Sequence, residues 1–290
     1  MRAAAVPWRV ARLARHGLEA LATAAKLVLA VVFVLPLLWM FLSSLRPVAE
    51  IFQYVFPLSI HTLVPVRVSV ESYRHLFADE PFARYLGNSF VMATGVTVLD
   101  LATSSLAAYG FARLRFAGRD ALFFLVLATM IIPFEALLVP LYLIVRDLGW
   151  VNSYLGLIVP MVPRAFSIFL LRQFFLGLPV ELEDAAKIDG CQFWRIYWHI
   201  VLPLSRPVLL SVALLTFQEM WGSFTWPLVV TNSTDLRVVQ VAIATFGQAG
   251  VTEWDKVFAG LSLAAVVPIV LFMAFQRYYA RGIATTGLRG

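Results

Sequence analysis

Carboxylate side chains are concentrated in one short stretch of a strongly apolar sequence. Residues 181–189 contain four of them, although only 14% of the 290 residues are charged and 61% are hydrophobic. Clustered carboxylates can bind a metal ion, transfer protons or pair with basic side chains of another protein. A metal centre has little support, because the four histidines show no metal-ligand spacing and Cys191 is the only cysteine. Two interpretations remain for the stretch, namely a docking element for a partner protein and a solvated connecting loop.

Sequence motifs of the commoner hydrolases are missing from the chain. It has no G-x-x-x-x-G-K-[ST] pattern, the loop with which many ATPases hold phosphates. It also lacks the HExxH pattern of zinc proteases and the GxSxG pattern of serine hydrolases. We therefore expect that the chain is not an enzyme, does not hydrolyse ATP by the usual loop, and binds no metal or cofactor itself.

Long apolar runs separate the charged residues and predict the fold class. A helix needs about 20 mainly apolar residues to cross a bilayer, and soluble domains carry about 25% charged residues, well above the value here. Prolines inside several runs are tolerated in membrane helices. We therefore expect an all-α integral membrane protein with six transmembrane helices, at residues 27–45, 85–112, 121–145, 148–171, 207–230 and 257–276.

The distribution of positive charge predicts the orientation of these six spans. If both termini are cytoplasmic, the inner segments carry fifteen Lys and Arg residues and the outer segments seven, in agreement with the positive-inside rule. The uncharged run of the first span is longer than a usual signal-peptide core, which favours a retained helix. We therefore expect cytoplasmic N and C termini.

The segments outside the spans have distinct expected roles. Residues 1–25 should form a cytoplasmic N-terminal segment and residues 26–290 the six-span domain. Within the former, residues 8–20 suit a short helix on the inner leaflet, with a flexible arm as the alternative. Long outer loops are expected at 46–84 and 231–256, whereas the acidic stretch lies in the longest inner connection.

The acidic stretch itself is typical of two short helices joined at Gly190. Early acids complement the positive end of a helix at Val180–Asp189, Glu183 and Lys187 can form an i,i+4 pair, and glycine can stop the helix in the left-handed conformation. The small apolar face of this helix would consist of Leu182, Ala185 and Ala186. The second helix, closed by Pro203, would carry an apolar stripe of Phe193, Ile196, Tyr197, Ile200 and Val201.

The whole stretch resembles the cytoplasmic EAA loop of bacterial ABC-importer permeases. That pattern is EAA, three residues, glycine, about nine residues, then I-x-LP, and "ELEDAAKIDGCQFWRIYWHIVLPLSRP" follows it between the expected fourth and fifth spans. Further stretches, such as "LAAYGFARLRFAGRDALFF", "FLLRQFFLGLP" and "FQRYYARGIATTGLRG", are similar to the second, shorter permease of the maltose-type carbohydrate importers. The resemblance covers about residues 26–290 and implies a type I importer fold.

The resemblance implies that residues 177–203 form a coupling loop that docks on a cytoplasmic ATPase. Asp184 matches the family's glutamate, which bonds a basic residue of the ATPase, and is one methylene shorter. Near the C-terminus, Gly287 and Arg289 match a tail that reaches toward the ATPase dimer. The loop positions carried over from the family comprise Glu181, Glu183, Asp184, Ala185, Ala186, Lys187, Asp189, Gly190, Leu202 and Pro203.

The family also implies the partners and the cofactor arrangement. The chain would pair with a second permease, two copies of the ATPase and an extracytoplasmic solute-binding protein, which would dock on the outer loops. ATP and Mg would be bound by the ATPase, and the chain would lie in the bacterial plasma membrane. One departure from the family is "WGSFTWPL", where "WNDFLWPL" is usual, so that Gly222 and Ser223 replace Asn and Asp.

Single charges inside the spans indicate a polar path or buried structural contacts. Asp100, Glu135, Arg164 and Glu219 each occupy a different span, and an ionised group at the bilayer centre costs about 2.5–3.5 kcal/mol. One interpretation is structural: Arg164 pairs with an acid, and Asp100 is satisfied by Thr97, Thr103 and Ser104. The other is a path for a carbohydrate or polyol, with candidate residues Glu135, Arg164, Gln218, Glu219, Trp221, Ser223 and Trp226.

Other functional classes remain as alternatives at this point. An ion-coupled secondary transporter would use the intramembrane acids, but such transporters commonly show internal repeats, and the sequence shows none. Within the importer interpretation, the solute could be a disaccharide, an amino sugar, a glycerophosphodiester or another small polyol. The sequence does not choose among them.

Overall fold

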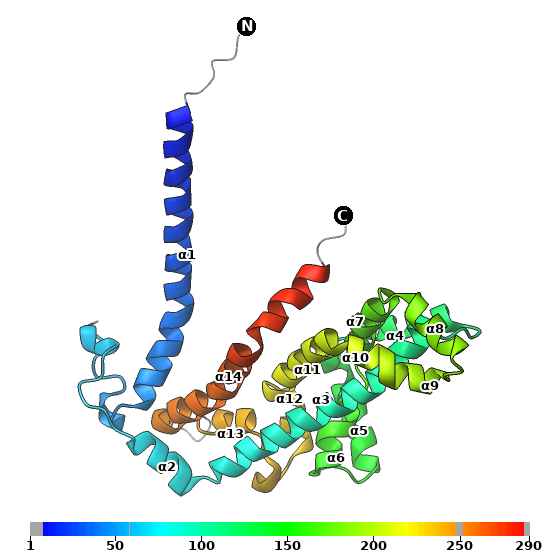
Figure 1. Ribbon diagram of the computed structural model, residues 1–290. Helices are drawn as coiled ribbons and strands as arrows, with labels where there is room; N and C mark the ends of the chain where they lie inside the picture. The colour runs from blue at the N-terminus through cyan, green and yellow to red at the C-terminus, as the bar shows by residue number, and fades with distance from the viewer. Residues whose placement is uncertain (1–7, 58, 248–251, 287–290) are drawn as a thin grey trace. The chain divides into compact units, whose positions relative to one another are not determined.

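Helices are the only regular secondary structure in the part of the chain that the structure describes. The computed structural model describes residues 8–57, 59–247 and 252–286, and Figure 1 shows the arrangement of its helices. Three helical segments are long and apolar enough to span a membrane alone, namely Leu18–Ser44, Phe82–Arg113 and Trp254–Gln276. Three bent helix pairs raise the number of candidate spans to as many as six. The predicted all-α membrane class is confirmed, and six is the upper number of candidate spans.

Prolines break two of the predicted spans. Helix α4 (Arg119–Ala128), extended by η3 (Thr129–Ile131), meets α5 (Phe134–Asp147) at a 102° bend beside Pro133. Helix α6 (Tyr154–Ile158), extended by η4 (Val159–Met161), meets α7 (Ala165–Leu176) at 46° beside Pro163. Proline lacks the N–H that continues a helix and clashes with the preceding turn, so each run becomes two helices.

The fifth span also differs from its prediction. Helix α11 (Arg206–Trp221) ends at Gly222, and a separate short helix, α12 (Thr225–Val230), follows. On its other side α11 meets the segment Phe193–Leu204 at a 77° bend, and this pair together is apolar enough to span. The predicted run 207–230 is therefore two helices, and the apolar character extends upstream into the coupling loop.

The contacts divide the chain into two compact units. Unit 1 comprises residues 1–79 and 252–262, and unit 2 comprises residues 80–251 and 263–290. Helix α14 (Trp254–Thr286) contributes its first residues to unit 1 and the remainder to unit 2. Helix α1 (Trp8–Ser44) runs without a break through residue 25, where the sequence suggested a segment boundary. Residues 8–20 are thus helical, but they form the start of α1 and not the separate short helix that was predicted.

Unit 1 is organised around aromatic side chains and a buried arginine. Trp39 packs edge-on against Phe258 with ring centroids 5.2 Å apart, and Phe52 does the same with Trp254 at 5.2 Å. Arg46 is buried and donates from Nη2 to the Thr62 carbonyl at 2.8 Å. Burial lowers the pKa of the Arg46 guanidinium from its ordinary value. Further elements of this unit are η1 (Val48–Glu50), η2 (Ile60–Thr62) and α2 (Glu71–Asp79).

Unit 2 is built around α3 (Phe82–Arg113), which packs against α7 and α11. The contact face of α3 is lined by small side chains, including Ala93, Ser104 and Ala108, which are all fully buried. Small residues permit close approach of helices inside a membrane. Helix α3 is therefore in contact with both α7 and α11.

The predicted second outer loop contains a packed helix. Helix α13 (Val239–Thr245) lies against α3 and buries Val239 and Ala242 completely. The amide of Asn88 in α3 donates to the carbonyls of Asp235 and Arg237 at 2.8 and 2.9 Å, close to η6 (Thr234–Leu236). Residues 238–243 therefore lie largely in the core of unit 2, whereas Thr234 and Asp235 are exposed at its edge.

Candidate functional site

The predicted short helix of the coupling loop is present as α8 (Val180–Ile188). Pro179 precedes it as the N-cap residue, and Gly190 adopts a left-handed φ of 77°. The Gly190 N–H donates to the Lys187 carbonyl at 3.0 Å, and the Cys191 N–H donates to the Ala186 carbonyl at 2.8 Å. These two bonds form a Schellman cap. The prediction that Gly190 ends the helix is confirmed.

The neighbouring acids Glu183 and Asp184 lie in different environments, one buried and one exposed. Glu183 is 3% exposed, and its Oε1 lies 2.8 Å from the Nε of Arg113 in α3. Asp184 is exposed and accepts a 2.9 Å hydrogen bond from Lys187. The predicted Glu183–Lys187 pair is therefore wrong. Successive helical residues differ by about 100° around the axis, so when residue 183 faces the protein residue 184 is directed away.

The predicted small apolar face of α8 is divided in the same manner. Ala186 lies on the buried face and belongs to the core cluster with Ala112 and Phe175. Leu182 and Ala185 are exposed, and Ile188 is 87% exposed. The exposed surface of α8 thus combines Asp184 with apolar side chains. Of the other loop positions carried over from the family, the structure leaves exposed Glu181, Lys187, Asp189 and Gly190.

The second half of the loop is less regular than predicted. It consists of α9 (Phe193–Ile196), a π-helical turn η5 (Tyr197–Val201) and α10 (Leu202–Leu204). The predicted apolar stripe is buried at Ile196, Tyr197 and Val201, half-buried at Ile200 and exposed at Phe193. Leu202 is half-buried and Pro203 is exposed within α10, so the chain turns after Leu204 and not at Pro203.

Asp100 forms a polar centre between three helices. It is fully buried in α3, and its two carboxylate oxygens accept hydrogen bonds from four donors. The donors are Ser104 Oγ at 2.6 Å, Ser167 Oγ at 2.6 Å, Thr216 Oγ1 at 3.0 Å and the Arg164 backbone N–H at 3.2 Å. The structural interpretation of Asp100 is confirmed, since every lone pair has a partner within the chain.

Two of the predicted partners of Asp100 are wrong. The hydroxyl of Thr97 donates to the Ala93 carbonyl, and that of Thr103 donates to the Leu99 carbonyl. Sequence reasoning missed Ser167 and Thr216, which come from α7 and α11, because only neighbours on the same helix can be found by spacing. Isolated hydroxyl residues inside apolar runs are the signal that could have indicated them.

Arg164 and Glu219 form an ion pair between the start of α7 and α11. The Arg164 side chain is 20% exposed and that of Glu219 is 59% exposed. The predicted pairing of Arg164 with an intramembrane acid is confirmed. Glu135 is exposed in the first turn of α5, and among the described residues it forms no ion pair. Charges at membrane depth do not face lipid, so the exposed Glu219 face belongs beside water or another subunit.

The aromatic candidates for a solute path are already bonded within the chain. Trp226 is 1% exposed, and its indole N–H donates to the Gly156 carbonyl at 3.0 Å. Trp221 is also buried and donates to the Ala264 carbonyl at 3.0 Å. Its ring stacks on Phe217 with an interplanar angle of 13°. Trp226 therefore has a structural role in this conformation, and its indole is unavailable to a solute.

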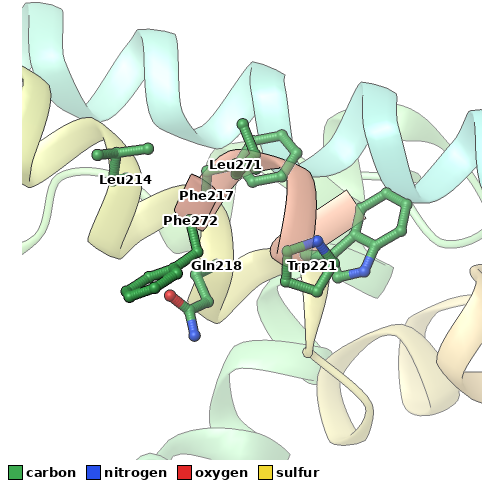
Figure 2. A pocket seen from close by; sticks show the side chains of 7 residues that line it. Leu214, Phe217, Gln218, Trp221, Leu271 and Phe272 are labelled. Carbon is green, nitrogen blue, oxygen red and sulfur yellow. The ribbon is translucent and has the colours of Figure 1, made fainter. Parts of the chain in front are cut away.

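A small pocket lies beside Trp221. Figure 2 shows Gln218 and Trp221 on α11 facing the pocket with Phe217 and, from the unit 2 part of α14, Phe272. The remaining lining residues are Leu214, Pro268 and Leu271. Gln218 is the one polar side chain in an otherwise largely apolar lining. Ser223, a further path candidate, is half-buried in the break that follows α11. The pocket thus brings together two of the predicted path residues.

The structure bears differently on the C-terminal ATPase contact and on a metal site. Gly287 and Arg289, the predicted C-terminal ATPase contact, lie outside the described residues. Among the residues that the structure describes, no group of three or more His, Cys, Asp or Glu side chains could hold a metal ion.

Comparison with known proteins identifies the family. Residues 100–285 match the family described as "Binding-protein-dependent transport system inner membrane component". The arabinooligosaccharide permease AraQ of Halalkalibacterium halodurans is 36% identical over 90% of this chain and 93% of its own length. The sn-glycerol-3-phosphate permease UgpE of Yersinia enterocolitica is 31% identical over 93% of this chain and 97% of its own.

Solved structures show the same fold. A chain of a bacterial ABC transporter involved in alginate import superposes with a TM-score of 0.80 at 24% identity, over 90% of this chain and 96% of that one. A chain of the MetNI methionine transporter gives a TM-score of 0.53 at 18% identity, over 73% and 98%. The predicted importer resemblance is confirmed by the sequence and the fold together. The chain belongs to the inner-membrane permease family of binding-protein-dependent ABC transport systems.

Proposed function

We propose that this permease subunit imports a carbohydrate or related polyol and is driven by ATP hydrolysis on separate subunits. Its curated relatives carry arabinooligosaccharides or sn-glycerol-3-phosphate, and the structural neighbour acts on alginate, an acidic polysaccharide. The chain would form half of the path, with a second permease as the other half. Two copies of a cytoplasmic ATPase and an extracytoplasmic solute-binding protein would complete the importer, and ATP and Mg would be bound by the ATPase.

The outward surface of α8 is the observation that carries the proposal. It presents Asp184 beside exposed Ala185 and Ile188, and the Schellman cap at Gly190 fixes where the helix ends. An exposed apolar side chain such as Ile188 gains by being covered, and a neighbouring carboxylate gives the contact a preference for a basic partner. Both features suit a cleft on an ATPase subunit, and neither is needed by a loop that only joins two spans.

The Arg164–Glu219 pair favours an uncharged solute. An arginine facing the path would attract an anion, but here the guanidinium is neutralised by Glu219. The pair as a whole carries no net charge, and Asp100 is closed off by its own hydrogen bonds. Within the importer interpretation we therefore favour a neutral oligosaccharide or polyol over a phosphorylated or acidic one.

The test is co-purification of the tagged chain from its native membrane, with wild type compared to Asp184→Lys. We expect wild type to bring a second permease, an ATPase and a solute-binding protein, which mass spectrometry can identify. The charge reversal should remove the ATPase selectively and leave the second permease bound. If wild type is purified alone or as a homodimer, the importer assignment of this chain fails. If Asp184→Lys retains the ATPase and transports normally, the docking role of α8 fails.

The solute class needs a separate measurement. The co-purified binding protein can be assayed by calorimetry against neutral oligosaccharides, polyols and their phosphorylated or uronic-acid counterparts. Tighter binding of an acidic ligand than of its neutral counterpart would contradict the argument from the Arg164–Glu219 pair, and it would leave the importer assignment intact.

A further inference from the structure

Three polar side chains of α3 lie on one face of the helix at spacing four. They are Ser105, Tyr109 and Arg113, and we call them the α3 stripe. Residues four apart follow one another along the same helix face. Ser105 and Tyr109 contact the second half of the coupling loop and Arg113 contacts its first half, so the loop is attached to α3 at three successive positions of this face.

The first two contacts hold the second half of the loop. The Ser105 hydroxyl and the Tyr197 hydroxyl are 2.7 Å apart, and both side chains are buried. The Tyr109 ring lies 5.3 Å from the Tyr197 ring, measured between centroids. The Tyr109 hydroxyl also donates a long hydrogen bond of 3.5 Å to the Phe193 carbonyl. These contacts fix η5 and the start of α9 against α3.

The third contact holds α8. Arg113 donates from Nη2 to the Leu178 carbonyl at 2.7 Å, immediately before the helix begins. Its Nε lies 2.8 Å from the Glu183 carboxylate. That N–H does not point at the oxygen, so the contact is an ion pair and not a linear hydrogen bond. The two side chains are only 11% and 4% exposed. A buried pair of this kind adds little net stability, but removing one partner leaves an uncompensated charge.

The other end of the same helix segment reaches the bundle core. Asp100 lies one to two turns before Ser105 on α3 and accepts hydrogen bonds from Ser167 in α7 and Thr216 in α11. A displacement of α8 would therefore move α3, and with it the helices that carry the Arg164–Glu219 pair. We propose that the α3 stripe is the connection that transmits movement of the docked loop to the membrane helices, with Arg113 and Glu183 as positioning residues.

This inference rests on the proposed function, and it separates the roles of two adjacent acids. Glu183, which the sequence assigned to the ATPase contact, acts inside the chain, whereas Asp184 acts on its surface. Loosening the stripe should leave the ATPase bound but uncouple its ATP hydrolysis from transport. A role of Glu183 in docking would instead remove the ATPase, and a merely structural role would lower the amount of folded complex without changing the coupling of the remainder.

The experiment uses the whole importer in proteoliposomes, with the binding protein and its solute identified as above. Glu183→Gln and Arg113→Gln should each lower solute transport per ATP hydrolysed at least tenfold, with ATPase stoichiometry unchanged. The charge exchange Arg113→Glu with Glu183→Arg should recover part of the coupling. Tyr197→Phe, which removes one buried hydroxyl and keeps the ring, provides a milder variant and should reduce the same ratio severalfold. Arg119→Gln, on an arginine that pairs with its neighbour Asp120, is the matched control.

The outcomes distinguish the inference from the proposed function. If the wild-type importer contains no ATPase, both fail. If wild type is coupled but Glu183→Gln loses the ATPase as Asp184→Lys does, Glu183 belongs to the docking surface and the stripe is refuted. Normal transport per ATP in Glu183→Gln, or in Tyr197→Phe should the charge variants not fold, refutes it equally.

Discussion

Replacement of Asp100 offers the sharpest test of how the bundle is held together. Asp100→Leu would remove the acceptor of three hydroxyl groups at buried positions and of the backbone N–H of the half-buried Arg164. A buried donor without a partner costs about 1–3 kcal/mol. The hydroxyls can turn to carbonyls one helical turn back, but the Arg164 N–H cannot. We therefore expect a loss of about 2–5 kcal/mol in the free energy of unfolding.

Asp100→Asn should be far milder, and the geometry indicates why. The amide oxygen can keep the bonds from Ser104 and the Arg164 N–H, which lie on the same carboxylate oxygen. The amide nitrogen then faces the hydroxyls of Ser167 and Thr216, which can rotate to accept. The variant loses only the extra strength of hydrogen bonds to a charged group, and the expected cost is about 1–2 kcal/mol.

The assay is thermal unfolding of the purified chain in mild detergent. The fraction of folded protein that remains after heating to each temperature is measured by size-exclusion chromatography. A shift of about 2–4 °C per kcal/mol predicts a fall of about 4–20 °C for Asp100→Leu and a few degrees for Asp100→Asn. The control is Thr103→Ala, which removes an exposed hydroxyl three residues after Asp100. This hydroxyl donates to the Leu99 carbonyl, and its loss should leave the midpoint unchanged. Equal midpoints for wild type and Asp100→Leu would refute the reasoning, as would equal losses for the Leu and Asn variants.

Two further predictions concern the loop and the intramembrane pair. Gly190→Ala should lower the free energy of unfolding by about 1–2 kcal/mol because of the left-handed φ, although no neighbouring atom obstructs a Cβ. Gly190→Pro cannot adopt that φ and should abolish transport while leaving the protein in the membrane. Normal transport by the proline variant would show that the cap is not needed. Arg164→Gln and Glu219→Gln should each reduce transport of the neutral solute more than the double variant does, since each single change leaves one charge uncompensated. A double variant worse than both singles would mean that each side chain contacts the solute separately.

The sequence was sufficient for the features that depend on local spacing. The apolar runs predicted membrane helices, and the placement of Gly190 predicted the end of α8, because both follow from the residues nearby in the chain. The broken helices at Pro133 and Pro163 could be anticipated only as tolerated prolines. Whether such a proline kinks a helix or ends it depends on which neighbours satisfy the freed carbonyls, and those neighbours are set by the tertiary fold.

The contacts between distant segments were beyond the reach of spacing. Glu183 was expected to pair with Lys187, four residues on, whereas it pairs with Arg113, which is 70 residues away in the sequence. Thr97 and Thr103 were the nearest hydroxyls to Asp100, yet Ser167 and Thr216 are the ones that complete its hydrogen bonding. In both cases the sequence indicated a buried carboxylate that needs partners, and spacing predicted partners on the same helix. Helix packing instead brings in partners from other helices.

The acidic stretch, finally, serves two requirements that its composition alone does not separate. A loop that transmits movement must be bound firmly both to the ATPase and to α3. If either contact were loose, the loop could move without moving the membrane helices. In α8 the two contacts are assigned to adjacent residues, with Glu183 directed toward Arg113 and Asp184 directed outward beside Ile188. Salt screens the buried Arg113–Glu183 pair much less than it screens an exposed carboxylate at a partner surface. Raising the salt concentration should therefore weaken attachment of the ATPase before it weakens the attachment of α8 to α3.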